Sequence, residues 1–144
     1  MEQLIQQLKV ILGTNFVLYF KGHTFHWNVE GSDFAQYHSF LGDFYDAVFE
    51  NTDSIAEHIR ALDSYAPTGV GRLLELSAIE ETDIVPSGLG MLSQLREDND
   101  KYIIQLRAGI VLADQAGEPA VGNYLQDLLD QHQKHAWMLR SFNE

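Results

Sequence analysis

Apolar residues recur at steps of three and four along four long stretches of the chain. This period places them on one face of an α-helix and predicts helices over residues 3–28, 34–62 and 89–114. A fourth helix is predicted to begin at Pro119, because proline suits the first helical turn. No strand-like alternation competes with this pattern, so we expect an all-α protein. The apolar positions that define the four faces include Leu4, Leu8, Ile11, Leu12, Phe16, Leu41, Phe44, Val48, Ile55, Ile59, Leu92, Leu95, Tyr102, Leu106, Val121, Leu125, Leu128 and Leu139.

The predicted helices are joined by two short connections and one long one. Glu30 and Gly31 form a corner between the first two helices, and Gly117 closes the third. The connection between the second and third helices is about 26 residues long and has the pattern of a short helix over residues 72–76. One long crossover in a bundle is the ferritin-like connectivity. We therefore expect residues 1–144 to form a single ferritin-like four-helix bundle with a short extra helix in the crossover.

The second predicted helix carries two apolar faces instead of one. Its start resembles a capping box, with Asp33 followed three residues later by Gln36. A second stripe lies about 100° around the helix from the core face and consists of Phe34, His38, Gly42, Tyr45, Phe49, Asp53 and Ala56. A surface helix of a monomer needs only one apolar face. The second face therefore predicts that this helix packs against another subunit.

Candidate metal ligands occur at both ends of this second helix. His26 lies just before the corner and His38 just after it, so we expect their imidazoles to face each other. His23 shares a helix face with His26, and Asp53 shares another with Glu57. Mixed imidazole and oxygen ligands suit Fe(II), Zn(II) and similar ions. The pattern therefore predicts a metal site built from these side chains.

The imidazoles and the carboxylates are far apart within one chain. Fifteen residues separate His38 from Asp53, which is roughly 22 Å along a helix that rises about 1.5 Å per residue. Metal–ligand bonds near 2 Å cannot span this distance. Either the two groups are unrelated half-sites, or the imidazoles of one chain meet the carboxylates of another. An antiparallel pair of second helices about a twofold axis would create two identical sites.

Composition excludes several classes of site and partner. Nine basic and 21 acidic residues give a net charge of -12, which disfavours binding to nucleic acid and attracts cations. The absence of cysteine excludes disulfides and thiolate metal sites. No Glu-x-x-His motif occurs, which argues against an intrachain di-iron centre. The opening residues do not resemble a signal peptide and no long apolar run spans a membrane, so we expect a cytoplasmic protein.

Other interpretations of these residues remain open. The interface could hold Zn(II) as a structural ion without turnover, or the chain could be an acidic helical interaction protein without a metal. Arg60 lies one turn from Glu57 and offers an ion-pair partner for that carboxylate. His132 and His135 fall among leucines on the last predicted helix. We interpret these two as core histidines with a structural role.

The candidate ligands belong to a longer pattern, which consists of HTFHWNVEG at residues 23–31, Phe34, His38 and DSIAE at residues 53–57. This pattern resembles the signature of the Dps family, the mini-ferritins. The segment HQKHAWML at residues 132–139 is similar to the family's last helix, and the resemblance covers essentially the whole chain. It implies a hollow dodecamer of four-helix bundles. Such a cage takes up Fe(II), oxidises it preferentially with hydrogen peroxide in place of oxygen, and stores Fe(III) mineral inside.

The resemblance also implies which residues hold iron. Ferroxidase centres at twofold interfaces would take His26 and His38 from one subunit and Asp53 and Glu57 from its partner. Glu57 would be the bridging carboxylate between two irons. His23 matches a position that is histidine in some members and lysine in others, so it could bind the second iron directly or through water. Zn(II) could substitute for iron at the same ligands.

The chain departs from the family in two places. Members that bind DNA often carry a lysine-rich tail, but only Lys9 lies near the start of this chain, so we expect no nucleic-acid binding. Acids near the start of the last helix line a threefold iron-entry pore in the family, and one such position is Asn123 here. The acids that could still supply a negative funnel are Asp114, Glu118, Asp127 and Asp130.

Overall fold

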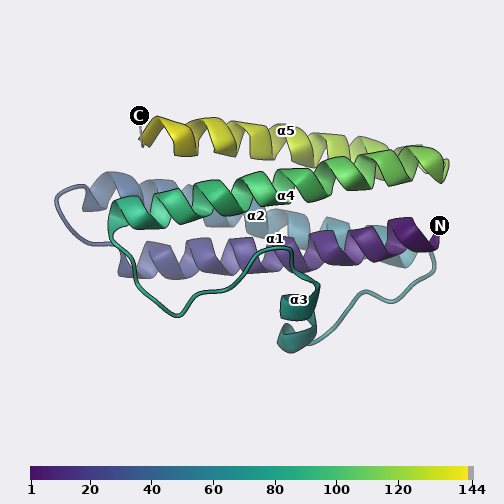
Figure 1. Cartoon of the computed structure of the whole chain (residues 1–144), viewed down its shortest axis with the longest axis horizontal. Coiled ribbons are helices and arrows are strands. Elements are labelled where there is room, and N and C mark those ends of the chain that lie inside the picture. The colour runs from purple at the N-terminus through teal and green to yellow at the C-terminus, as the bar shows by residue number, and fades with distance from the viewer. Residues whose placement is uncertain (143–144) are drawn as a thin grey trace.

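The computed structural model describes residues 1–142 and confirms the predicted all-α, ferritin-like bundle. The helices are α1 (Glu2–Asn28), α2 (Phe34–Ala61), α3 (Val70–Leu76), α4 (Gly88–Gln115) and α5 (Pro119–Phe142). Helices α1 and α2 form one hairpin and α4 and α5 the other, while α3 sits in the long crossover beside α1 (Figure 1). Every helix boundary predicted above lies within two residues of the observed one. None of the described helices combines the length and apolar character that crossing a membrane requires.

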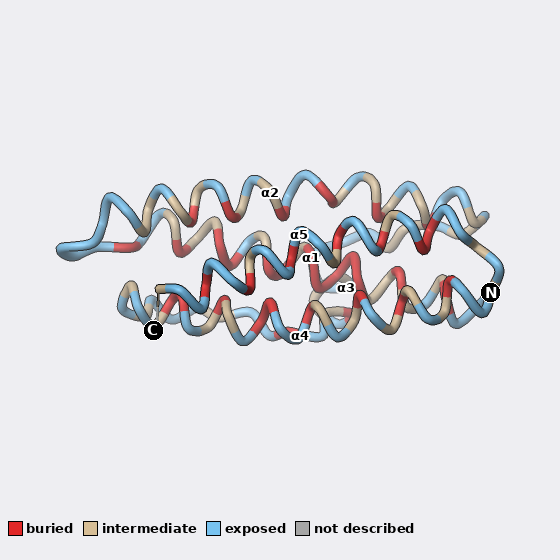
Figure 2. Tube along the Cα trace, turned by 90° about the horizontal axis from the view of Figure 1, so that it is seen from above, coloured by how far each residue is buried: buried red, intermediate tan, exposed pale blue. Residues whose placement is uncertain are grey.

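The core lies between the two hairpins and is built from the predicted apolar faces (Figure 2). Leu41 and Phe44 of α2 are buried, and so is Tyr102 of α4. The second stripe of α2 differs, because Phe34 and Phe49 are 43% and 53% exposed. This uncovered apolar face is available for the subunit contact that the sequence predicts, and that contact stays a prediction.

Glycines with positive φ close two of the connections. Gly31 turns the chain between α1 and α2 with φ 111°, a value that residues with a side chain rarely adopt. Gly117 has φ 68° after α4. The N–H groups of Gly117 and Glu118 donate to the carbonyl oxygens of Asp114 and Ala113, which satisfies the end of the helix.

The predicted capping box at the start of α2 is wrong. Asp33 is the N-cap residue, but its side chain makes no cap hydrogen bond. Its backbone has φ -100° and ψ 19° instead of the extended conformation from which a capping side chain reaches the next turn. Ser87 shows that arrangement at the start of α4, where ψ is 162° and the hydroxyl accepts from the Gly90 N–H. The tight turn after α1 therefore overrides the local motif.

Buried polar side chains connect the helices across the bundle. Lys21 of α1 and Asp98 of α4 form an ion pair of 2.7 Å, with 7% and 10% of their side chains exposed. The Tyr102 hydroxyl donates to Asn15 Oδ1 at 2.9 Å, and Asn15 Nδ2 donates to the Val48 carbonyl at 3.0 Å. A shift of any helix along its axis would leave one of these groups unpaired in the core. The contacts therefore fix the register of α1, α2 and α4.

Candidate metal centre

The hairpin between α1 and α2 brings His26 and His38 together, as the sequence predicts. Their rings are stacked with centroids 3.7 Å apart and an interplanar angle of 18°. His26 lies in the last turn of α1, and His38 lies in the second turn of α2. Helices α1 and α2 run antiparallel (Figure 1), so the stacked rings lie at one level of the hairpin. Their role as ligands stays a prediction.

Two reciprocal hydrogen bonds hold these imidazoles. His26 Nδ1 lies 2.8 Å from the His38 carbonyl oxygen, and His38 Nδ1 lies 2.8 Å from the His26 carbonyl oxygen. A carbonyl oxygen only accepts, so each Nδ1 must carry a proton and donate it. In the neutral ring the lone pair then lies on Nε2. This is the state in which a histidine binds a metal ion through Nε2 while its other nitrogen is oriented by an oxygen.

His23 is held by aromatic side chains next to this pair. Its ring stacks on Tyr45 at 3.8 Å with an interplanar angle of 8°, and its Nδ1 lies 2.9 Å from the Tyr19 hydroxyl. The centroid of the Trp27 ring lies 4.7 Å from that of His23. Desolvation lowers the pKa of His23, and the nearby His26 lowers it further, so the imidazole is neutral at pH 7. A neutral ring held in one orientation is suited to bind a cation.

The two tyrosines that hold His23 were not identified from the sequence. Tyr19 lies four residues before His23, which is the spacing of neighbours on a helix surface, so the pattern contains a signal for this contact. Tyr45 belongs to the second stripe of α2, but its stacking on a ring of α1 depends on how the two helices cross. Such a contact needs the three-dimensional structure.

Asp53 and Glu57 lie one turn apart on the exposed surface of α2. The helix is continuous between His38 and Asp53, so the separation of roughly 22 Å expected from about 1.5 Å per residue is retained. Arg60, the alternative partner for Glu57, donates to the Ser64 carbonyl at 3.0 Å. Among residues 1–142, no group of three or more histidine and acidic side chains is arranged to hold a metal ion. One chain therefore contains an imidazole group and a carboxylate group that do not meet.

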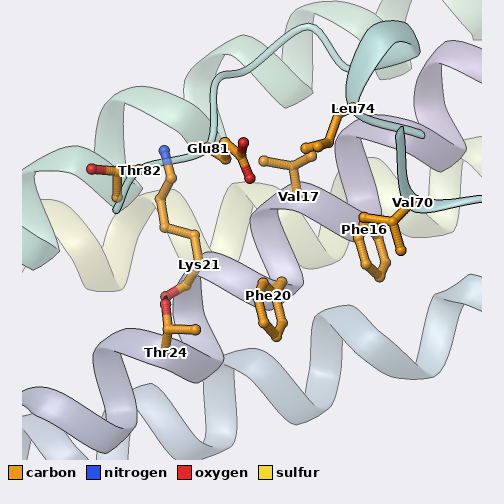
Figure 3. A pocket seen from close by; sticks show the side chains of 9 residues that line it. All are labelled: Phe16, Val17, Phe20, Lys21, Thr24, Val70, Leu74, Glu81 and Thr82. Carbon is orange, nitrogen blue, oxygen red and sulfur yellow. Dashed lines mark hydrogen bonds between the residues drawn. The ribbon is translucent and has the colours of Figure 1, made fainter. Parts of the chain in front are cut away.

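A pocket of about 290 Å³ lies farther along α1, between α1, α3 and the crossover (Figure 3). Its walls are mainly apolar and include Phe16, Phe20 and Leu74. The Lys21 side chain at its edge is already paired with Asp98. The lining contains one carboxylate, from Glu81, and no imidazole, so this pocket lacks the donors of a metal centre.

Comparison with known proteins places these features in a family context. A family model described as a ferritin-like domain matches residues 5–144. The DNA protection during starvation protein of Brevibacillus brevis is 30% identical over 100% of this chain and 100% of its own. An uncharacterized low temperature-induced protein of a Nostoc strain is 32% identical over 99% of this chain and 81% of its own. The crystal structure of Dps from Staphylococcus aureus superposes with a TM-score of 0.96 at 26% identity, covering 100% of this chain and 97% of that one.

Proposed function

This chain belongs to the Dps family of ferritin-like proteins, and on that premise we propose that it is an iron-storing mini-ferritin that oxidises Fe(II) at sites between subunits. The observation that carries the proposal is the pair of reciprocal hydrogen bonds between His26 and His38. With both Nδ1 atoms held by carbonyl oxygens, each stacked ring in its neutral form has its lone pair on Nε2. A packed bundle has no structural need for stacked, ligand-ready imidazoles at that position.

The carboxylates of the site come from a second subunit. Asp53 and Glu57 are exposed on α2, next to the uncovered apolar face that includes Phe49. Antiparallel packing of two α2 helices about a twofold axis brings the carboxylate end of one helix to the imidazole end of the other. Each dimer then has two identical sites, each with His26, His38, Asp53 and Glu57. His23 is the ligand for the second iron, because its ring is already oriented beside His26.

The reaction oxidises two Fe(II) ions per site. Each Fe(II) gives up one electron, and hydrogen peroxide takes both electrons and two protons to form two water molecules. Because both electrons leave in one site, no hydroxyl radical is released. Glu57 bridges the two irons, and the protein holds them close enough for peroxide to contact both. Peroxide is the preferred oxidant, oxygen is the slower one, and Zn(II) competes for the same ligands.

Storage follows from assembly into a closed cage, for which we infer a dodecamer in the cytoplasm. The net charge of -12 attracts Fe(II) and disfavours contact with nucleic acid. Asp114, Glu118 and Asn123 line one hollow at the turn between α4 and α5. Asp114 and Glu118, together with Asp127 and Asp130 of α5, form the negative funnel through which Fe(II) enters. The Fe(III) product collects as mineral inside the cage.

The test is anaerobic loading of the purified assembly with Fe(II), followed by peroxide or oxygen while Fe(III) absorbance is recorded. Asp53→Ala removes a proposed ligand, and Asp43→Ala is the matched control because Asp43 is also an exposed aspartate of α2. We expect rapid peroxide-dependent oxidation in the parent and the control, and its loss in Asp53→Ala. Size-exclusion chromatography verifies that all three proteins assemble equally.

Two outcomes would contradict the proposal. Slow oxidation that is the same in all three proteins would mean that Asp53 is not a ligand of a ferroxidase site. Retention of one tightly bound Zn(II) per site after purification, with no Fe(II) oxidation, would instead identify a structural metal site. Metal analysis of the purified protein separates these two results.

A further inference from the structure

A second pair of histidines lies inside the bundle, away from the hairpin site. His132 and His135 are both on α5, and neither takes part in the proposed ferroxidase reaction. We propose that these two side chains form an intrachain binding site for a single Cu(I) ion. This site lies within one subunit and does not depend on the proposed function.

The orientation of His132 is fixed by a pair of hydrogen bonds to Asn99 of α4. Asn99 Nδ2 donates to the His132 carbonyl oxygen at 2.9 Å, which determines how the amide is turned. Asn99 Oδ1 therefore faces His132 Nδ1 at 2.7 Å and accepts its proton. The lone pair of the neutral ring consequently lies on Nε2, as it does in His26 and His38.

The Nε2 atom of His132 is the unusual feature of this site. His132 is 0% exposed, and within the described part of the chain Nε2 has no hydrogen-bond partner. Buried polar atoms almost always have a partner, so this lone pair in a packed core is available to a ligand that the protein itself does not supply. It is the one buried side-chain nitrogen or oxygen among residues 1–142 without such a partner.

His135 supplies the second donor. It lies three residues after His132, on the same face of α5, and the two ring centroids are 5.1 Å apart with an interplanar angle of 69°. Nitrogens that share one ion through bonds of about 2 Å are about 3 to 4 Å apart, and rings at this separation can span that distance. His135 is only partly buried, so it gives an ion access from the surface.

Both imidazoles are neutral at pH 7. Burial lowers the pKa of His132 well below its usual value and lowers that of His135 to about 4. A metal ion therefore does not have to displace a proton from either ring. This removes the usual competition between protons and metals at histidine sites near neutral pH.

The surroundings of the pair favour a monovalent ion. The neighbouring rings are Tyr102 at 4.6 Å from His132 and Phe44 at 4.9 Å from His135. Within residues 1–142, neither histidine forms a side-chain hydrogen bond or ion pair with a carboxylate. A divalent ion with two neutral ligands would leave two uncompensated charges in an apolar core. Zn(II) also requires about four ligands. Cu(I) carries one charge, accepts imidazole and is stable with two ligands.

The experiment is an anaerobic titration of the assembled protein with Cu(I) against a coloured Cu(I) chelator. It is done in a His23→Ala, His26→Ala, His38→Ala background, which removes all three imidazoles of the hairpin site and makes the result independent of the proposed ferroxidase. We expect one Cu(I) per chain, and at least about tenfold weaker binding after a further His135→Gln substitution. His58→Gln is the matched control, because His58 packs on Tyr124 outside the core pair.

His135→Gln is preferred to substitution of His132, because His132 is fully buried and hydrogen-bonded to α4. Circular dichroism verifies that each variant is folded. X-ray absorption at the copper edge should show two imidazole nitrogens in the parent background. Equal Cu(I) affinity in His135→Gln and His58→Gln would overturn the site. Zn(II) binding at His135 that Cu(I) cannot displace would overturn the assignment of copper.

Discussion

Two pairs of imidazoles in this protein have different surroundings. The hairpin pair is His26 and His38, and the core pair is His132 and His135. His26, His38 and His132 each hold Nδ1 against an oxygen, which in the neutral ring places the lone pair on Nε2. The hairpin pair lies at the edge of an uncovered apolar face, where in the proposed dimer another subunit supplies carboxylates. The core pair lies among rings of α2 and α4, and in the described chain it forms no ion pair with a carboxylate. In the two proposed sites the same hydrogen-bond arrangement therefore serves different ions, because the surrounding charge determines which ion is stable.

The largest effect that separates the two pairs is the response of the core pair to acid. The pKa of His135 is about 4 in the folded protein and about 6.5 in the unfolded chain. Between these two pH values, protons therefore bind preferentially to the unfolded chain. The contribution of neutral His135 to the free energy of unfolding is fully present above about pH 6.5. It is lost as the pH falls to about 4, and the loss is about 3 kcal/mol. His132 adds to this loss, because its pKa is also lowered.

Urea unfolding followed by circular dichroism at pH 7 and pH 4.5 measures this loss. His135→Gln removes one of the two buried titrating groups, so it should have a smaller difference between the two pH values than the parent. His58→Gln, whose histidine lies outside the core pair, should keep the full difference. A His135→Gln protein as acid-sensitive as the parent would show that this histidine does not control the acid response.

The next effect concerns activity and should be confined to the hairpin pair. His38→Ala removes one proposed ligand and the hydrogen bond to the His26 carbonyl. We expect the rate of peroxide-driven Fe(II) oxidation to fall by at least about 100-fold, while His135→Gln retains the parent rate. Stopped-flow absorbance on assembled protein measures both. A comparable fall in the oxidation rate of both variants would mean that Fe(II) oxidation does not depend specifically on the hairpin pair.

Asn99→Ala tests how strongly the core pair depends on its hydrogen bonds. The substitution leaves His132 Nδ1–H and the His132 carbonyl without their Asn99 partners in a buried environment. We expect a loss of about 1–3 kcal/mol in the free energy of unfolding. Asn28→Ala is the control, since Asn28 donates to the Thr24 carbonyl at an exposed position, and should change stability by less than about 0.5 kcal/mol. If urea unfolding gives the same loss in free energy for Asn99→Ala and Asn28→Ala, burial does not increase the stabilising effect of the Asn99 hydrogen bonds.

The smallest effect concerns the turn that brings the hairpin pair together. Gly31→Ala places a side chain on a residue with φ 111°, so we expect a loss of about 1 kcal/mol. Gly71→Ala is the control, because Gly71 lies in α3 with open space around the position of a Cβ. It should be neutral or slightly stabilising. Thermal unfolding compares the two, and a Gly31→Ala protein as stable as Gly71→Ala would show that the turn is not strained.

The sequence predicts the helices and the hairpin pair for one reason. Both follow from spacing along the chain, either the repeat of apolar residues or the positions of His26 and His38 on the two sides of a corner. Contacts between helices that are distant in sequence could not be predicted. Lys21 with Asp98 and His132 with Asn99 are examples, because each depends on the relative rotation and register of two helices. The Asp33 cap failed for a related reason, since the turn geometry determines whether a side chain reaches the helix end.

The reciprocal bonds between His26 and His38 also affect how subunits come together. Both bonds lie within one chain, so folding of the hairpin immobilises the two imidazoles before a partner arrives. Immobilising a flexible side chain during association costs about 0.5–1.5 kcal/mol each. This entropy has already been lost when the monomer folds. In the proposed dimer, subunits therefore pair without rearrangement of the histidine half-site.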